Sequence, residues 1–223
     1  MSASRGLVIA IDGPSGAGKS TIGRALAEAL SYTYLDTGAM YRAVAVRALE
    51  QDTPLDDPDA LARAARSAVI SFDETGKRIY LDGREVTGEI RTRETTRAAS
   101  AVAKTGAVRR EMVRRQQELG REGGVVLDGR DIGSVVFPNA DVKFYLDAAP
   151  EKRARRRFEE HPGEASFEAI LADIRARDHQ DMTREDSPLV RTPDAVYVDS
   201  TEMTADQVLT HLLAVVSKVI SRS

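Results

Sequence analysis

The residues with the clearest chemical potential lie near the start of the chain, in the stretch Gly13-Pro14-Ser15-Gly16-Ala17-Gly18-Lys19-Ser20, with Thr21 after it. They match the pattern G-x-x-x-x-G-K-[ST], which binds nucleotide phosphates. The glycines let successive backbone N–H groups point at one anion, and a helix start adds roughly half a positive charge there. Lys19 would reach the β- and γ-phosphates, and the Ser20 hydroxyl would bind Mg²⁺. The alternative is a glycine-rich turn that only joins a strand to a helix.

A second charged group, Asp128-Gly129-Arg130-Asp131, follows the apolar run Val125-Val126-Leu127. A carboxylate at the end of a buried strand can hold metal-bound water beside a nucleotide. Arg130 and Asp131 would then offer a cation and an acceptor in the same cleft. A turn with a solvated ion pair is the alternative, but the position after a buried strand favours a functional site.

Charged residues in the last third of the chain continue an apolar helix face. Arg177, Asp181 and Arg184 follow Ile170 and Ile174 at steps of three and four. Such a face packs on the core and then emerges into a cleft. Surface ion pairs at helical spacing would give the same pattern, so both interpretations stay open.

An arginine-rich segment precedes this helix and a Pro-Gly break separates the two; its arginines are Arg153, Arg155, Arg156 and Arg157. Mobile arginines can close over phosphates, stabilise phosphoryl transfer and exclude water. A solvated helix face is the alternative, and composition does not separate the two.

The elements that must position these groups alternate between strands and helices. Alternation of this kind predicts an α/β fold with a parallel sheet and helices on both faces. Because ligands bind at the carboxyl ends of parallel strands, the phosphate loop, Asp36, Asp128 and Asp199 should lie along one edge. Five strands are expected, near residues 7–11, 33–36, 125–128, 142–146 and 195–199.

One segment departs from this alternation. Residues 69–72 and 78–81 are strand-like and are separated by a polar turn, and Asp82-Gly83 leads into a third short run. Asp-Gly between strand-like runs is a strong hairpin signal. We therefore predict a small antiparallel meander, centred on residues 69–92, inserted into the α/β chain.

Bulk composition narrows the class of protein. The chain has 223 residues, of which 42% are hydrophobic and 30% charged, with a formal net charge of −3 and no cysteine. Cysteine-based catalysis, disulfides and cysteine zinc sites are excluded. Neither the charge nor any apolar run indicates a nucleic-acid or membrane partner, and no signal peptide is evident. We expect a cytoplasmic enzyme, and a monomer because each apolar stripe has an intramolecular partner.

Taken together, the motifs resemble those of the bacterial cytidylate kinases, which are P-loop nucleoside monophosphate kinases. The similarity extends along nearly the whole chain, and its most specific parts are Gly88-Glu89-Ile90-Arg91-Thr92 and Asp128-Gly129-Arg130-Asp131-Ile132-Gly133. It also includes the phosphate loop, residues 35–42, 135–138, 187–189 and 199–201, and Arg177-Asp178 with Asp181 and Arg184.

This resemblance implies transfer of the γ-phosphoryl group of ATP to CMP or dCMP with Mg²⁺, and the P-loop kinase fold. It implies a core of residues 1–62, 104–154 and 167–223, an inserted monophosphate-binding domain over 63–103, and a lid over 155–166. Cytosine would be held by Ser100, Arg109 and Asp131. The acceptor phosphate would be held by Arg42 and Arg130.

The sugar would be held by Arg177 and Asp181, with Arg184 near the sugar and phosphates, and Asp36 and Thr37 would lie close to the acceptor. The catalytic group implied in this way is Lys19, Asp128, Arg130, Arg184 and, from the lid, Arg157. No protein nucleophile is expected, because positioning, Mg²⁺ and arginine charge account for most phosphoryl transfer.

Two other functions stay open at this point. One is a kinase for a different small acceptor, against which the Ser100, Arg109 and Asp131 set argues. The other is a nucleotide-dependent switch. A signalling GTPase recognises guanine with Asn-Lys-x-Asp, whereas the one asparagine here, Asn139, is followed by alanine.

Overall fold

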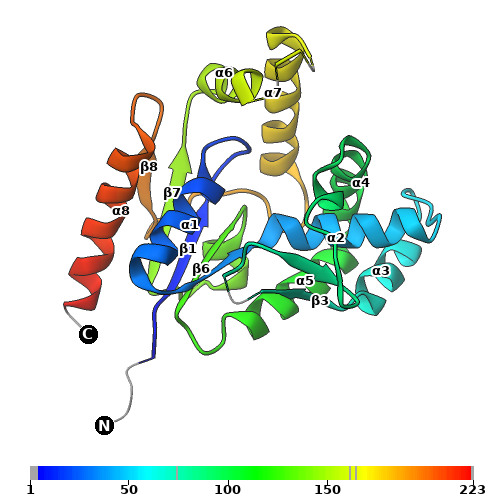
Figure 1. Ribbon diagram of the computed structural model, residues 1–223, viewed down its shortest axis with the longest axis horizontal. Coiled ribbons are helices and arrows are strands. Elements are labelled where there is room, and N and C mark those ends of the chain that lie inside the picture. The colour runs from blue at the N-terminus through cyan, green and yellow to red at the C-terminus, as the bar shows by residue number, and fades with distance from the viewer. Residues whose placement is uncertain (1–4, 74, 161, 164, 222–223) are drawn as a thin grey trace. The chain divides into compact units, whose positions relative to one another are not determined.

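The computed structural model describes residues 5–73, 75–160, 162–163 and 165–221. The chain forms two compact units (Figure 1). The first unit contains the chain up to Tyr32 and again from Gly124 onward, and the second contains Thr33–Gly123.

Buried parallel strands form the centre of the first unit. Strand β1 pairs in parallel with β6 and with β7, and β7 pairs in parallel with β8. β1 and β6 are buried along their whole length, as expected for apolar runs in a covered parallel sheet. The strand order of this five-stranded sheet is β2-β6-β1-β7-β8. Four of the strands belong to the first unit: β1 (Val8–Asp12), β6 (Val125–Gly129), β7 (Val142–Asp147) and β8 (Val196–Asp199). The fifth, β2 (Thr33–Asp36), belongs by sequence to the second unit.

The helices of the first unit pack on this sheet and on one another (Figure 1). Helix α1 contacts β6 and α8, and α6 lies against α7 around a small apolar core of Ala154, Ile170 and Ile174. Helix α8 begins with a capping box in which Thr204 and Gln207 bond each other's backbone N–H. The helices are α1 (Lys19–Leu30), the one-turn π-helix η2 (Ile132–Val136), α6 (Pro150–Glu160), α7 (Phe167–Thr183) and α8 (Ala205–Ile220).

The second unit combines helices with a three-stranded antiparallel sheet in the order β3-β4-β5. Asp82 and Gly83 make the tight turn between β4 and β5, both with positive φ (51° and 80°). A core of buried side chains joins α2 to α3, α4 and α5. The elements are α2 (Thr37–Glu50), α3 (Pro58–Ser67), β3 (Ile70–Phe72), β4 (Ile79–Leu81), β5 (Arg84–Glu85), the 3-10 helix η1 (Glu89–Arg91), α4 (Arg93–Lys104) and α5 (Gly106–Leu119).

These observations confirm the predicted α/β class, the five-stranded sheet and the antiparallel meander. Helix α2 begins at Thr37 because the Asp36 carboxylate caps it. Helix α5 ends at Leu119, and Gly120 follows as its C-cap. Among the described helices, none is both long and apolar enough to cross a membrane.

Candidate active site

The phosphate loop leaves β1 at Gly13 and enters α1 at Lys19. Gly13 has φ 148°, and a Cβ there would sit 1.9 Å from the Leu146 carbonyl oxygen, so only glycine fits. Gly18 caps α1 in the left-handed region and contributes no side chain. The first N–H groups of α1 are therefore left for a ligand, which is the arrangement that binds phosphates at a helix start.

Lys19 is buried beneath this loop. Its exposed fraction is 6%, and its Nζ donates a hydrogen bond to the Pro14 carbonyl oxygen at 2.7 Å. Burial, followed by the positive charge of Arg130, lowers the pKa of Lys19 to about 7, although the carboxylates of Asp128 and Asp12 act in the opposite direction. A bound phosphate would restore the fully charged ammonium, so Lys19 is poised to receive an anion.

Ser20 and Asp128 join the phosphate loop to the end of β6. The Ser20 Oγ donates to Asp128 Oδ2 at 2.8 Å, and Asp128 is 4% exposed. Both residues were candidates from the sequence, and the structure brings them together across 108 positions of the chain. A hydroxyl oxygen and a carboxylate thus lie next to the place where nucleotide phosphates would bind.

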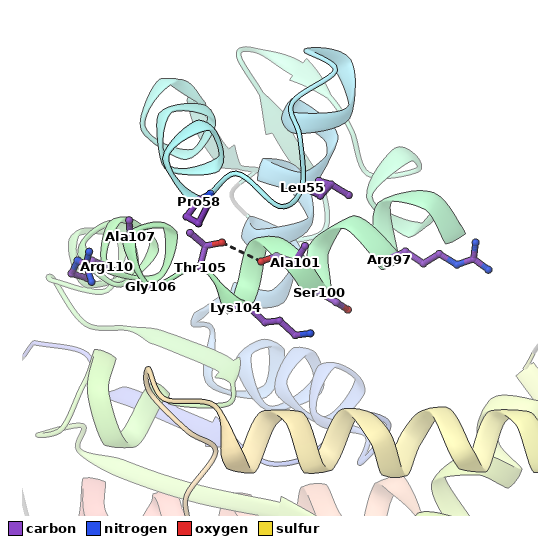
Figure 2. Close-up of a pocket in the computed structure, with 10 residues that line it drawn as sticks. All are labelled: Leu55, Pro58, Arg97, Ser100, Ala101, Lys104, Thr105, Gly106, Ala107 and Arg110. Carbon is purple, nitrogen blue, oxygen red and sulfur yellow. Dashed lines mark hydrogen bonds between the residues drawn. The ribbon is translucent and has the colours of Figure 1, made fainter.

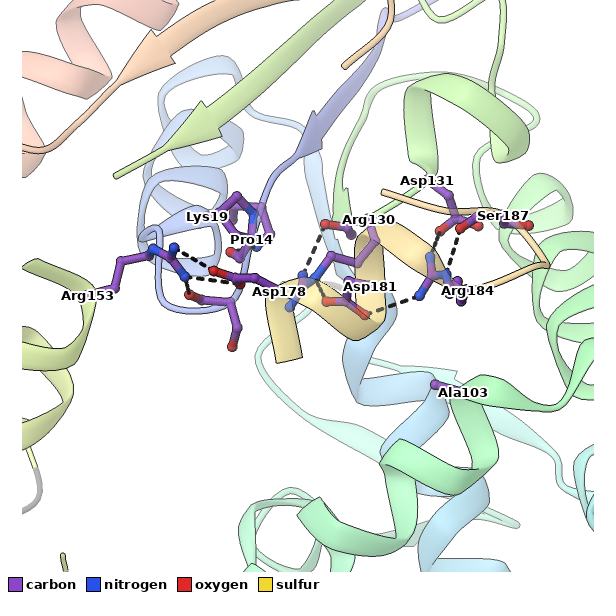
Figure 3. A network of polar contacts seen from close by, with 12 residues as sticks. Pro14, Lys19, Ala103, Arg130, Asp131, Arg153, Asp178, Asp181, Arg184 and Ser187 are labelled. Carbon is purple, nitrogen blue, oxygen red and sulfur yellow. Dashed lines mark hydrogen bonds and ion pairs between the residues drawn. The ribbon is translucent and has the colours of Figure 1, made fainter. Parts of the chain in front are cut away.

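A network of arginines and carboxylates follows β6 (Figure 3). The Arg130 Nε lies 2.8 Å from Asp181 Oδ2, and Arg184 NH1 lies 3.3 Å from Asp181 Oδ1. Arg184 also approaches Asp131, with 3.9 Å between NH2 and Oδ1, and its Nε donates to the Ser187 carbonyl oxygen at 2.7 Å. Two of the charged residues that continue the α7 stripe, Asp181 and Arg184, therefore lie in one network with Arg130 and Asp131.

Asp12, which received no role from the sequence, organises this loop. It is 6% exposed, and its two carboxylate oxygens accept the N–H groups of Ile132 and Gly133 at 2.8 and 2.7 Å. These N–H groups belong to the first turn of η2, directly after Asp131. Asp12 therefore fixes the segment that carries Arg130 and Asp131 to the end of β1, where the phosphate loop begins.

The Asp12→Asn variant should lose one part of the pH dependence of stability. Burial raises the pKa of Asp12 from 3.8 to about 6, against the effect of its two N–H donors. The folded chain thus keeps a proton that the unfolded chain releases between pH 4 and 6, so this group's contribution to stability falls as pH rises through that window. Urea unfolding at several pH values should show the wild-type advantage over Asp12→Asn shrinking by on the order of 3 kcal/mol from pH 4 to 7. Parallel curves would contradict the assignment.

The arginine-rich helix α6 does not behave as one solvated face. Arg153 is 3% exposed and is buried in an ion pair with Asp178 of α7. Arg155 lies over the Phe167 ring at 5.2 Å, and Arg156 donates to the Ser200 carbonyl oxygen at 2.8 Å. The interpretation of this run as solvated is therefore wrong for Arg153, which neither faces solvent nor is free to move over phosphates.

Arg157 and Arg177 lie on facing helices of the same unit. Arg157, on α6, is exposed, whereas Arg177, on α7, is half-buried. Burial lowers the pKa of Arg177, and the charge of Arg157 lowers it further, which places the two guanidinium groups close enough to repel each other. A phosphate between them would relieve this repulsion.

The second unit carries the other expected acceptor residues. The Asp36 carboxylate caps α2 by accepting the Ala39 N–H at 2.8 Å and pairs with Arg42 NH2 at 2.9 Å. Thr37, the first residue of α2, is 3% exposed. Gly38 lies close to both paired side chains. A Cβ at this position would be 3.1 Å from Arg42 NH1 and 3.2 Å from Asp36 Oδ1, so a larger residue would crowd the ion pair.

Ser100 and Arg109 come from consecutive helices of the second unit. Arg109, on α5, is 3% exposed; its NH1 donates to the Ala103 carbonyl oxygen at 3.2 Å, and its guanidinium lies 5.4 Å from the Tyr41 ring centre. Ser100 is half-buried on α4, one turn before Ala103, and it lines a hollow of about 720 Å³ (Figure 2). Asp131, the third residue expected at the base, belongs to the first unit.

A phosphate loop after the central strand of a parallel sheet, with a carboxylate bonded to its serine, defines a P-loop nucleotide-binding protein. A gluconokinase structure from Sinorhizobium meliloti is similar in fold, with a TM-score of 0.50 and 15% identity over 98% of this chain and 95% of that chain. The family model described as "Cytidylate kinase" matches residues 9–218. The chain belongs to the cytidylate kinase family.

Two curated relatives support this membership. A cytidylate kinase of Enterococcus faecalis is 46% identical over 215 residues, covering 94% of this chain and 95% of that protein. A cytidylate kinase of Bacillus subtilis is 44% identical over 217 residues, covering 95% of this chain and 97% of that protein.

Proposed function

We propose that this chain transfers the γ-phosphoryl group of ATP to CMP or dCMP, giving ADP and CDP or dCDP. The observation that carries the proposal is the proximity of two cations with different tasks. Lys19 belongs to the phosphate loop, whose Ser20 Oγ bonds Asp128 of β6 at 2.8 Å, and Arg130 follows Asp128 in the chain directly after β6. The charge of Arg130 also lowers the pKa of Lys19. A donor phosphate on Lys19 and an acceptor phosphate on Arg130 would therefore be adjacent, as in-line transfer requires.

The residues of the first unit support catalysis by positioning and charge. Lys19 would balance charge on the β- and γ-phosphates, and Arg130 would orient the acceptor phosphate and balance charge on the transferring group. Arg184 and the lid residue Arg157 would add further positive charge. Since the phosphate oxygen of CMP is itself the nucleophile, no covalent intermediate with the protein is needed.

The proposal includes a Mg²⁺ ion that binds together with ATP. Ser20 and Asp128 fit this role, because Mg²⁺ prefers oxygen ligands and is held by one or two protein groups plus phosphates and waters. Within the described residues, no group of three or more histidine, cysteine or acidic side chains could hold a metal without the nucleotide. When bound, the ion would neutralise charge on the β- and γ-phosphates.

Recognition of the acceptor is proposed from the chemistry of cytosine and ribose. Asp131 would accept the exocyclic amino group, Arg109 would donate to the carbonyl and ring nitrogen, and Ser100 would complete the base site. Arg42 would contact the acceptor phosphate together with Arg130, near Asp36 and Thr37. Arg177 and Asp181 would hold the sugar, and Arg184 would lie near the sugar and the phosphates.

Two segments are proposed to support these roles. Residues 63–103 would form the monophosphate-binding domain, and residues 155–166 the lid; positions 161 and 164 of that lid lie outside the described residues. All residues proposed to contact ATP or the acceptor belong to one chain, so the proposal needs no second subunit.

The test is release of ADP from Mg-ATP with CMP, dCMP, UMP, AMP or GMP added separately. Fast turnover is expected with CMP and dCMP, and little with the purine nucleotides. Comparable turnover with AMP or GMP would contradict the assignment of Ser100, Arg109 and Asp131 to the base. ADP formation that needs no monophosphate would instead favour a nucleotide-dependent switch.

A further inference from the structure

One guanidinium group in the first unit connects three separate segments (Figure 3). Arg153 donates from NH1 to the Ser15 carbonyl oxygen of the phosphate loop at 3.0 Å and from Nε to the Ala148 carbonyl oxygen at 2.7 Å. Its NH1 and NH2 also donate to the two carboxylate oxygens of Asp178 at 3.1 and 2.6 Å. Arg153 therefore links the phosphate loop, the segment before α6, and helix α7.

This link is rigid for physical reasons. The side chains of Arg153 and Asp178 are 3% and 12% exposed, so water competes little for their charges. Two parallel N–H···O bonds fix the angle between the groups as well as their distance. The stem of Arg153 also packs on the loop, since a Cβ at Gly16 would meet the Cβ of Arg153 at 3.4 Å. The loop and α7 therefore cannot shift independently without breaking buried contacts.

Helix α7 carries the residues that are proposed to hold the sugar of the acceptor. Arg177 precedes Asp178, Asp181 follows one turn later, and Arg184 is the C-cap of the helix. Asp181 in turn bonds Arg130 and Arg184. A movement of Asp178 would therefore be transmitted to the cations and the carboxylate that are proposed to hold the sugar and the acceptor phosphate.

We infer that Arg153 and Asp178 form a positioning pair that couples nucleotide occupancy of the phosphate loop to the affinity of the acceptor site on α7. Phosphates that bind the loop N–H groups reorient the loop, including the Ser15 carbonyl, and Arg153 passes this change to Asp178. The inference rests on the function proposed above. It adds that binding of ATP or ADP at the phosphate loop changes the affinity of the site proposed for CMP.

A second ion pair between the same helices provides a matched control. Glu151 of α6 and Arg175 of α7 approach to 2.6 Å, but their side chains are 55% and 61% exposed. Unlike Arg153, neither side chain of this pair bonds the phosphate loop among the described residues, and exposed pairs contribute little to stability. Glu151→Gln therefore removes a helix–helix ion pair while the connection through Ser15 is kept.

The experiment measures the Kd of CMP by calorimetry with and without saturating Mg-ADP, which occupies the loop but cannot phosphorylate CMP. In the wild type and in Glu151→Gln, Mg-ADP should tighten CMP binding by about fivefold or more, the lower end of typical coupling. In Asp178→Asn, the factor should fall to within about twofold of unity. Because coupling is reciprocal, CMP must change the Kd of ADP by the same factor.

Arg153→Lys is a second test of the same pair, because it keeps the charge but loses the two-point contact. It should also lose most of the coupling. A purely structural role would weaken both ligands or lower the unfolding temperature while the coupling factor persists, and that result in either folded variant would overturn the inference. An unchanged coupling factor in the Arg153 and Asp178 variants overturns the inference but leaves the proposed function standing. A wild-type chain that binds no CMP overturns both the inference and the proposed function.

Discussion

Replacement of Lys19 by methionine should lower kcat for CMP phosphorylation by roughly 10²–10³-fold, the usual cost of removing one preorganised group that stabilises transition-state charge. Lys19 is the cation inside the phosphate loop, and its burial, which lowers its pKa to about 7, leaves its charge poorly solvated. An anion at this place gains more from it than from a lysine in water. Steady-state kinetics with saturating CMP and varied Mg-ATP would measure the loss.

The control for this variant is Lys152→Met. Lys152 lies on α6 of the same unit, with a 41% exposed side chain that approaches Glu202 at 3.6 Å, and it should leave kcat within about twofold, as exposed pairs contribute little. Lys19→Met should also keep or raise the unfolding temperature, because it removes a buried charge. A near-normal kcat in Lys19→Met would contradict the phosphate-loop assignment. If Lys19→Met does not fold, its loss of activity has a structural cause.

The parts of the site that could be predicted from sequence are those written in short, local patterns. The phosphate loop is contiguous, so the spacing of its glycines, Lys19 and Ser20 is enough to predict both the backbone turn and the two side chains that accompany it. The pairing of Ser20 with Asp128 could also be anticipated, because both follow buried strands whose carboxyl ends meet at one edge.

Other parts could not be predicted, because they depend on contacts between distant residues with no pattern of their own. Asp12 bonds backbone groups 120 and 121 positions away, and a single carboxylate before a glycine-rich loop gives no sign of such partners. Arg153 stands among other arginines that face solvent, an aromatic ring or a backbone carbonyl, and its burial follows from the packing of α6 on α7. Its one available signal was that Asp178 shares a helix with the predicted site residues.

The resulting site is held ready by its own carboxylates. Arg130 and Arg184 both contact Asp181, and Lys19 lies near Asp12 and Asp128. The positive groups that are proposed to face phosphates are thereby held in place by protein carboxylates. Phosphates would compete with these carboxylates for the arginine and lysine side chains. Because a phosphate carries more negative charge than a carboxylate, pairs between these cations and phosphate would replace the pairs with carboxylates.

Among these cations, we expect Arg130 to contribute most to phosphoryl transfer once a phosphate replaces its carboxylate partner. Arg130→Met should reduce kcat/KM for CMP by about 10³–10⁵-fold, the range for an arginine that stabilises a transferring phosphoryl group. The KM for Mg-ATP should change by no more than a few-fold, since Lys19 and the loop N–H groups hold the donor. Kinetics with each substrate varied in turn would measure the two effects separately.

Arg130→Lys and Arg191→Met complete this test. The lysine variant keeps the charge but lacks the planar fork that binds phosphate at two points, so it should recover part of the loss. Arg191, which lies over the Tyr197 ring at 5.0 Å, is exposed and should be replaceable with little effect on either substrate. Equal damage to the KM values of ATP and CMP in Arg130→Met would place Arg130 on the donor side. In that case binding of the acceptor phosphate would depend on Arg42 and Arg177. Lys19 and Arg130 would then both bind the phosphates of ATP.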